Sequence, residues 1–114
     1  MPVPPVQENV NIGMTASTVI EKYTLDAVSS SATSTTVTLT NNTASSVSVQ
    51  YILAAYTADG QMVASSTVAS DLQSQKSIKL TVQYSAKDQV SWVSAFVLQA
   101  GTLQPLRAVW KKAL

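Results

Sequence analysis

The sequence predicts an all-β fold, a two-sheet antiparallel sandwich of about seven strands, and three observations support this prediction. Val, Thr, Ser and Ala are abundant, and this mixture suits half-buried pleated strands with a hydroxyl-rich outer surface. Short strand-like runs recur at intervals of about 8–12 residues with turn residues between them. No segment keeps a clear apolar period of 3.6 residues over about eleven positions, which argues against a helical fold.

The expected strands are Ile20–Val28, Thr35–Asn41, Val47–Thr57, Gln61–Val68, Lys76–Tyr84, Val90–Leu98 and Leu106–Lys111. Between them stand the turn sequences Asn41-Asn42, Ala58-Asp59-Gly60 and Ala100-Gly101. The dipeptide Asp59-Gly60 is the strongest hairpin signal in the chain. About seven short strands with regular turns are typical of an immunoglobulin-like sandwich.

Alternation along the strands predicts which residues face the core. The third strand has apolar residues at its odd positions, but Ile52 and Tyr56 add apolar groups to the even face, so we expect that its outer face is partly covered. In the sixth strand we assign the face with Trp92 and Phe96 to the core. The predicted core is Val37, Leu39, Val49, Tyr51, Leu53, Ile78, Leu80, Val82, Trp92 and Phe96. For Trp110 a core position and an exposed anchor are equally compatible with the sequence.

The chain divides into an extended, Pro-rich N-terminal arm, residues 1–19, and one sandwich domain, residues 20–114. Three of the first five residues are prolines, which fix φ and favour an extended start that cannot join the interior of a sheet. The arm also carries apolar residues that have no place in the sandwich. The predicted assembly arm consists of Pro2, Val3, Pro4, Pro5, Val6, Val10, Ile12 and Met14. We expect it to dock on a neighbouring subunit, and the alternative is a frayed terminus.

The residues that usually carry catalysis are scarce, so we expect a protein that is not an enzyme. Histidine and cysteine are absent, and the only bases that could activate a serine are lysines. The six acids are dispersed, and we interpret Asp59, Asp71 and Asp88 as turn formers, so we expect no metal and no cofactor. Asn41-Asn42-Thr43 matches a glycosylation acceptor pattern, but we interpret it as a turn.

Charge and hydropathy also exclude several partners. The net charge is +1, with the basic residues scattered, so we expect no nucleic-acid partner. No apolar stretch approaches the roughly 20 residues of a membrane-spanning helix, and prolines follow Met1 where a signal peptide has basic and then apolar residues. We therefore expect no membrane insertion, no signal peptide and no small-molecule substrate.

The segment from Val37 to Leu106 resembles the immunoglobulin-like modules repeated in secreted and surface-attached proteins of Gram-positive bacteria. The matching pieces are VTLTNNT, ILAAYTADGQMV, KSIKLTVQY and SAFVLQAGTLQPL. Leu98-Gln99 stand where that family usually carries Trp-Asp, so no contact of that pair transfers to this chain. The resemblance implies a sandwich fold and a spacer or adhesive role outside a cell.

These observations favour a non-enzymatic structural subunit that assembles with copies of itself or with a larger scaffold protein of a capsid, tail or surface layer. A phage virion protein, such as a capsid decoration, head fibre or tail protein, is the first expectation. An extracellular spacer or adhesion module of a bacterial surface-layer or cell-wall protein is the second, and a glycan-binding module is the third. The expected location is accordingly a virion surface or a cell surface.

Overall fold

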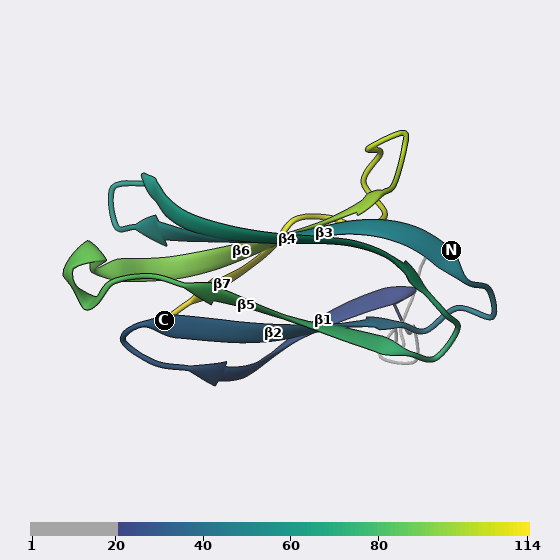
Figure 1. Ribbon diagram of the computed structural model, residues 1–114, viewed down its shortest axis with the longest axis horizontal. Helices are drawn as coiled ribbons and strands as arrows, with labels where there is room; N and C mark the ends of the chain where they lie inside the picture. Colours follow the sequence, from purple (N-terminus) through teal and green to yellow (C-terminus); the bar gives the residue numbers. More distant parts are fainter. Residues whose placement is uncertain (1–20) are drawn as a thin grey trace, which may run out of the picture.

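Two antiparallel sheets face one another in the computed structural model, which describes residues 21–114 (Figure 1). One sheet has three strands in the order β1-β2-β5, and the other has four strands in the order β4-β3-β6-β7. The predicted all-β sandwich of seven antiparallel strands is confirmed. The predicted arm, residues 1–19, lies outside the described residues.

The strands are β1 (Tyr23–Ser30), β2 (Ser34–Asn41), β3 (Val47–Thr57), β4 (Met62–Leu72), β5 (Ser77–Gln83), β6 (Val90–Gln99) and β7 (Trp110–Ala113), with one 3-10 turn, η2 (Ala86–Asp88), before β6. The bounds of β3 agree with the sequence prediction, and five other strands overlap their predicted ranges closely. The seventh is displaced, because its continuous ladder with β6 covers only residues 110–113, and Pro105 before it forms an isolated bridge with Leu98. Leu106 instead donates its backbone N–H to Val97, and Arg107 turns toward the other sheet.

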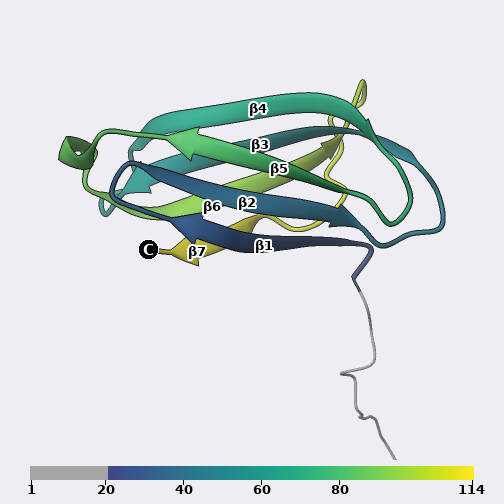
Figure 2. The ribbon, with the colours of Figure 1, turned by 60° about the horizontal axis from the view of Figure 1, so that its bottom comes forward.

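The core lies between the two sheets (Figure 2). Its residues are Tyr23, Leu25, Val37, Leu39, Val49, Tyr51, Leu53, Ala55, Leu72, Val82, Val93, Ala95 and Val97. Six of the ten predicted core residues are fully buried. Ile78 and Leu80 pack against the core but are only half-buried, because β5 is an edge strand and neighbours cover them on one side. Trp110 also packs against the core, so of the two positions open to it in the sequence it takes the core position and not that of an exposed anchor.

Trp92 and Phe96 are not core residues, so this part of the prediction is wrong. Tyr51 and Leu53 of β3 face the core, and directly opposite them in β6 stand Val97 and Ala95. Opposite residues of an antiparallel pair share a face, so the small apolar residues of β6 point inward and its aromatic residues point outward. The register between β3 and β6 therefore reverses the predicted facing of β6.

Tyr51 connects the two sheets through the core. Its side chain is fully buried, and its phenol O–H donates to the carbonyl oxygen of Val37 in β2 at 2.9 Å. Burial raises the pKa of the Tyr51 phenol above its ordinary value of 10.0, because the interior disfavours the phenolate. The folded protein therefore holds this proton at a pH where the unfolded chain releases it.

The stability of the domain should fall above about pH 10 by up to about 1.4 kcal/mol per pH unit from Tyr51 alone. The sign follows from proton binding: above pH 10 the folded state binds more protons than the unfolded state, so raising the pH favours unfolding. Tyr51→Phe should cost about 1 kcal/mol at neutral pH and should remove this part of the pH dependence. Urea denaturation at about pH 8 and pH 11 measures both effects. Equal pH slopes for the wild type and Tyr51→Phe would contradict the assignment.

The turns follow the predicted residues in most places. Gly60 has φ of 90°, and its N–H donates to the Thr57 carbonyl, so the predicted hairpin after β3 is confirmed. Asp88 accepts from the backbone N–H of Ser85 at 2.9 Å and closes the turn before β6. Asp71, however, lies within β4, where its carboxylate accepts from the Ser48 hydroxyl, so its assignment to a turn is wrong.

Candidate interaction surface

The outer face of the four-stranded sheet is the most apolar surface that the strands of this sandwich present. Since the odd-numbered residues 49–55 of β3 and 93–97 of β6 face the core, the even-numbered residues paired beside them point away from it. We call this surface the aromatic face. It consists of Ile52, Ala54, Tyr56, Trp92, Ser94, Phe96, Leu98 and Lys111. None of its apolar members belongs to the core cluster between the sheets or packs against it.

The pairing of the strands arranges these residues in rows across the sheet. Tyr56 of β3 stands opposite Trp92 of β6, and Ile52 stands opposite Phe96. Between these rows lies a row of small residues, in which Ala54 stands opposite Ser94. Two rows of large apolar side chains thus lie on either side of a row of small residues.

The centre of the aromatic face is closed to water although it lies outside the core. Ala54 is 1% exposed and Ser94 is 6% exposed, while the larger residues around them are half-buried. Because neither residue faces the other sheet, the larger side chains on the same face are what shields them. These side chains therefore form a second apolar cluster, and one side of this cluster is in contact with solvent.

The aromatic rings of this cluster stand against one another. The rings of Tyr56 and Trp92 are stacked, with centroids 5.6 Å apart and an angle of 14° between their planes. The ammonium group of Lys111 lies over the Trp92 ring, 4.4 Å from its centroid. Tyr56 approaches from β3 and Lys111 from β7, on either side of β6, so both faces of the Trp92 ring are occupied.

The outer face of the three-stranded sheet has the opposite character. Hydroxyl groups pair across its strands, with Thr36 bonded to Thr81 at 2.7 Å and Thr40 bonded to Ser77 at 2.8 Å. Between these pairs, Thr38 has Asp26 on one neighbouring strand and Lys79 on the other. Most hydroxyls of this face pair across the strands, although the buried Thr38 hydroxyl has no hydrogen-bond partner within the described residues, whereas the aromatic face leaves large apolar side chains partly exposed.

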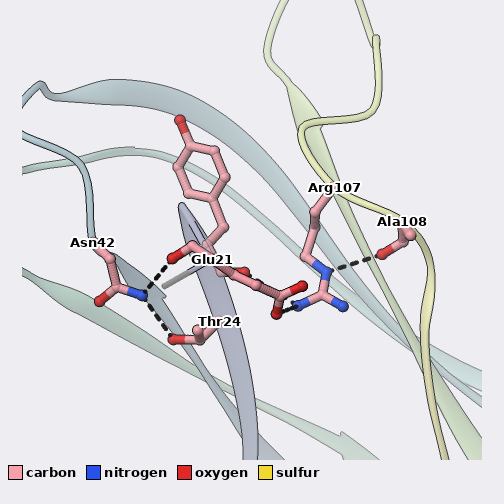
Figure 3. A network of polar contacts seen from close by, with 6 residues as sticks. Glu21, Thr24, Asn42, Arg107 and Ala108 are labelled. Atoms are coloured by element: carbon pink, nitrogen blue, oxygen red, sulfur yellow. Dashed lines mark hydrogen bonds and ion pairs between the residues drawn. The ribbon is translucent and has the colours of Figure 1, made fainter. Parts of the chain in front are cut away.

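The segment before β7 connects the two sheets at one edge of the sandwich (Figure 3). Arg107 donates from Nη1 to the backbone carbonyl of Tyr23 at 3.1 Å, and the same nitrogen lies 3.7 Å from the Glu21 carboxylate. Asn42 donates to the backbone carbonyl of Glu21 at 3.0 Å and to the Thr24 hydroxyl at 3.2 Å. These contacts hold Glu21 and the start of β1 against the edge of the sandwich.

The described part of the chain lacks a pocket, a cluster of metal-ligating residues and a membrane-spanning helix. No pocket is present among residues 21–114. In that range no group of three or more acids, histidines or cysteines could hold a metal ion. No helix within it is long and apolar enough to cross a membrane.

The sequence prediction named interaction residues only on the arm, and none of these residues lies within the described part of the chain. The aromatic face was missed because Trp92 and Phe96 were assigned to the core. One signal for it was present, since Ile52 and Tyr56 made the even face of the third strand apolar, and the structure confirms that this face is partly covered.

Solved structures with a similar fold include two β-glucuronidases from Bacteroides uniformis, one of them covalently bound to cyclophellitol-6-carboxylate aziridine, and a putative β-galactosidase from Bacteroides fragilis. Their TM-scores are 0.51 for the first glucuronidase, 0.50 for the inhibited one and 0.50 for the galactosidase, at 10%, 10% and 17% sequence identity. Each alignment covers 82% of this chain, but only 13%, 13% and 16% of the respective enzyme. At these identities the likeness shows the fold alone, which is an immunoglobulin-like β-sandwich.

No protein-family model matches the sequence, and no curated protein matches it. The resemblance to modules of Gram-positive surface proteins therefore stays a prediction. The fold and the aromatic face together describe a small immunoglobulin-like module with one apolar and one polar outer surface.

Proposed function

We propose that this chain is a non-enzymatic structural module that assembles by protein–protein contacts through its aromatic face. The observation that carries this proposal is the contrast between the two outer surfaces of the sandwich. One surface is hydroxyl-rich and bonds to itself, and the other holds stacked aromatic residues around a centre that is already dry. Exposed apolar clusters with enriched aromatic residues are typical of protein interfaces.

A protein partner suits this surface better than a glycan does. Sugars stack on the open faces of aromatic rings, but the faces of the Trp92 ring are occupied by Tyr56 and Lys111. The surface therefore presents ring edges and aliphatic groups from Ile52 and Leu98, which suit the side chains of another protein. Its single positive charge, on Lys111, is too little to attract a nucleic acid.

The setting that we propose for this module is an extended assembly. The chain has only 11% charged residues, and low charge reduces repulsion between neighbouring copies. A virion surface, as a capsid decoration, head fibre or tail protein, is our first proposal for the assembly. A spacer or adhesion module of a bacterial surface-layer or cell-wall protein is the alternative. The resemblance of the segment from Val37 to Leu106 to such modules favours it.

A charge placed on the aromatic face should weaken the association of the chain. Phe96→Glu puts a carboxylate beside Ile52 in the apolar cluster, and we expect it to cost about 2 kcal/mol of binding or more, a roughly 30-fold weaker contact. The matched control is Val28→Glu, because Val28 is 53% exposed on the other sheet. Sedimentation of the purified full chain over a range of concentrations measures the association of all three proteins.

Thermal melts of the same variants show whether each remains folded. The proposal predicts that Phe96→Glu is folded and associates less, while Val28→Glu associates like the wild type. Equal association of Phe96→Glu and the wild type would show that contacts form elsewhere on the molecule.

A further inference from the structure

The residues that precede Glu21 contain a pattern that matches the aromatic face. In the stretch NVNIGMTAS, residues 9–17, the even positions hold Val10, Ile12, Met14 and an alanine, and the odd positions are polar or glycine. An extended chain with this period places its apolar side chains on one side. The stretch therefore has the composition of a segment that lies along an apolar protein surface.

We infer that residues 1–20 of a second copy of this chain occupy the aromatic face, with Val10, Ile12 and Met14 against its aromatic cluster. This inference rests on the proposed function, and it names the partner as another copy of the same chain. Each copy then receives one arm and provides one arm, which is a heterologous contact that forms rings or open chains of subunits.

Charge supports this pairing. Glu8 is the only charged side chain among residues 1–20, and Lys111 is the only charged residue among the eight that define the aromatic face, while Asp71 on the same side of the sheet is bonded to Ser48. An arm whose apolar residues lie along this face brings a carboxylate into reach of an ammonium group. The other residues of the stretch NVNIGMTAS and of the eight that define the aromatic face are neutral.

The arm begins at the edge of the sandwich, on the side of the three-stranded sheet, and its length allows it to reach a second copy. The Glu21 carbonyl is bonded to Asn42, next to the three-stranded sheet, and the adjacent carbonyl of Tyr23 is bonded to Arg107. The aromatic face lies on the outer side of the other sheet, so the arm of the same molecule has to turn around the sandwich edge to reach it. Twenty extended residues span up to about 66 Å, which is ample for a neighbouring copy. Prolines at positions 2, 4 and 5 restrict φ, and a restricted segment loses less entropy on docking.

Mixing two defective full-length variants tests this inference directly. The arm variant is Val10→Asp with Ile12→Asp, and the face variant is Phe96→Glu. The matched control of the arm variant is Asn9→Asp with Asn11→Asp, which adds the same charge on the polar side of the stretch. Sedimentation at about 100 µM, well above the dissociation constant of a micromolar contact, gives the assembly state of each sample.

We expect the wild type and the asparagine control to associate, and each defective variant alone to be at least 10-fold weaker. Mixing the arm variant with the face variant should restore association as a 1:1 complex, because one intact arm then meets one intact face. A mixture that stays monomeric overturns the inference, and so does a wild-type chain that is monomeric at this concentration. If the arm variant associates like the wild type while the face variant does not, the arm is not the occupant, but the proposed role of the aromatic face stands.

Discussion

Leu53→Ala should destabilise the domain by about 3–5 kcal/mol, the largest loss that we expect from a single apolar truncation in this chain. Leu53 is fully buried in β3, a central strand of its sheet, where Ser66 and Ala95 stand opposite it on the two neighbouring strands. Because both of these neighbours are small, few side chains can move into the space that the leucine leaves. The cavity term therefore adds to the lost transfer free energy.

Two leucines provide a graded comparison for this variant. Leu103 is 53% exposed, so Leu103→Ala should change the free energy of unfolding by less than about 0.5 kcal/mol. Leu80 is half-buried on the edge strand β5, so Leu80→Ala should fall between the two. Urea denaturation curves, fitted with one common dependence of the free energy of unfolding on urea concentration, give this free energy for all three variants. A similar loss for Leu53→Ala and Leu103→Ala would show that the core is not where the structure places it.

Asn41→Ala should cost about 3–5 kcal/mol, although it removes no apolar group. Asn41 is fully buried at the end of β2, and its amide donates to the carbonyls of Leu72 at 3.0 Å and Ser45 at 2.9 Å. Its side-chain oxygen accepts from the backbone N–H of Thr43 at 2.9 Å. Alanine would remove this partner from the Leu72 carbonyl and the Thr43 N–H, while the Ser45 carbonyl keeps its bond from the Thr43 hydroxyl, and each unpaired buried group costs about 1–3 kcal/mol.

Asn42 is the matched control, since it is the same residue type one position further along the chain. It is half-buried and donates to Glu21 and Thr24 near the surface, where water can replace it. Asn42→Ala should therefore cost no more than about 1.5 kcal/mol. If the two alanine variants unfolded at the same urea concentration, the role of Asn41 in holding the end of β2 would be wrong. The burial of Asn41 also agrees with reading Asn41-Asn42-Thr43 as a turn, because a buried amide cannot carry a glycan.

The aromatic face explains how one small module can present two different surfaces. In β6, the inward positions are small because Tyr51 and Leu53 of β3 already fill the space between the sheets. The large residues of β6 are therefore free to point outward, where Trp92 stacks with Tyr56. A sandwich that placed its largest residues in the core would have no such surface.

The sequence by itself determined the all-β class, the number of strands, most of their bounds and the chemistry of the turns. These features depend on local properties, namely alternation, β-branched composition and the special conformations of Asp-Gly and Asn-containing turns. The extent of β3 and the hairpin at Asp59-Gly60 could be read directly, because apolar residues end where turn residues begin.

Only the tertiary structure decided which face of β6 is buried, where β7 begins and therefore where the aromatic face lies. Both faces of β6 are apolar, so alternation alone does not tell which face is buried. The large size of Trp92 and Phe96 suggested that their face was the buried one, and this was wrong. The pairing of Val97 with Tyr51 and of Ala95 with Leu53 settled the choice. Residues distant in the sequence fix that register, because they compete for the same volume between the sheets, and no local pattern in β6 contains this information.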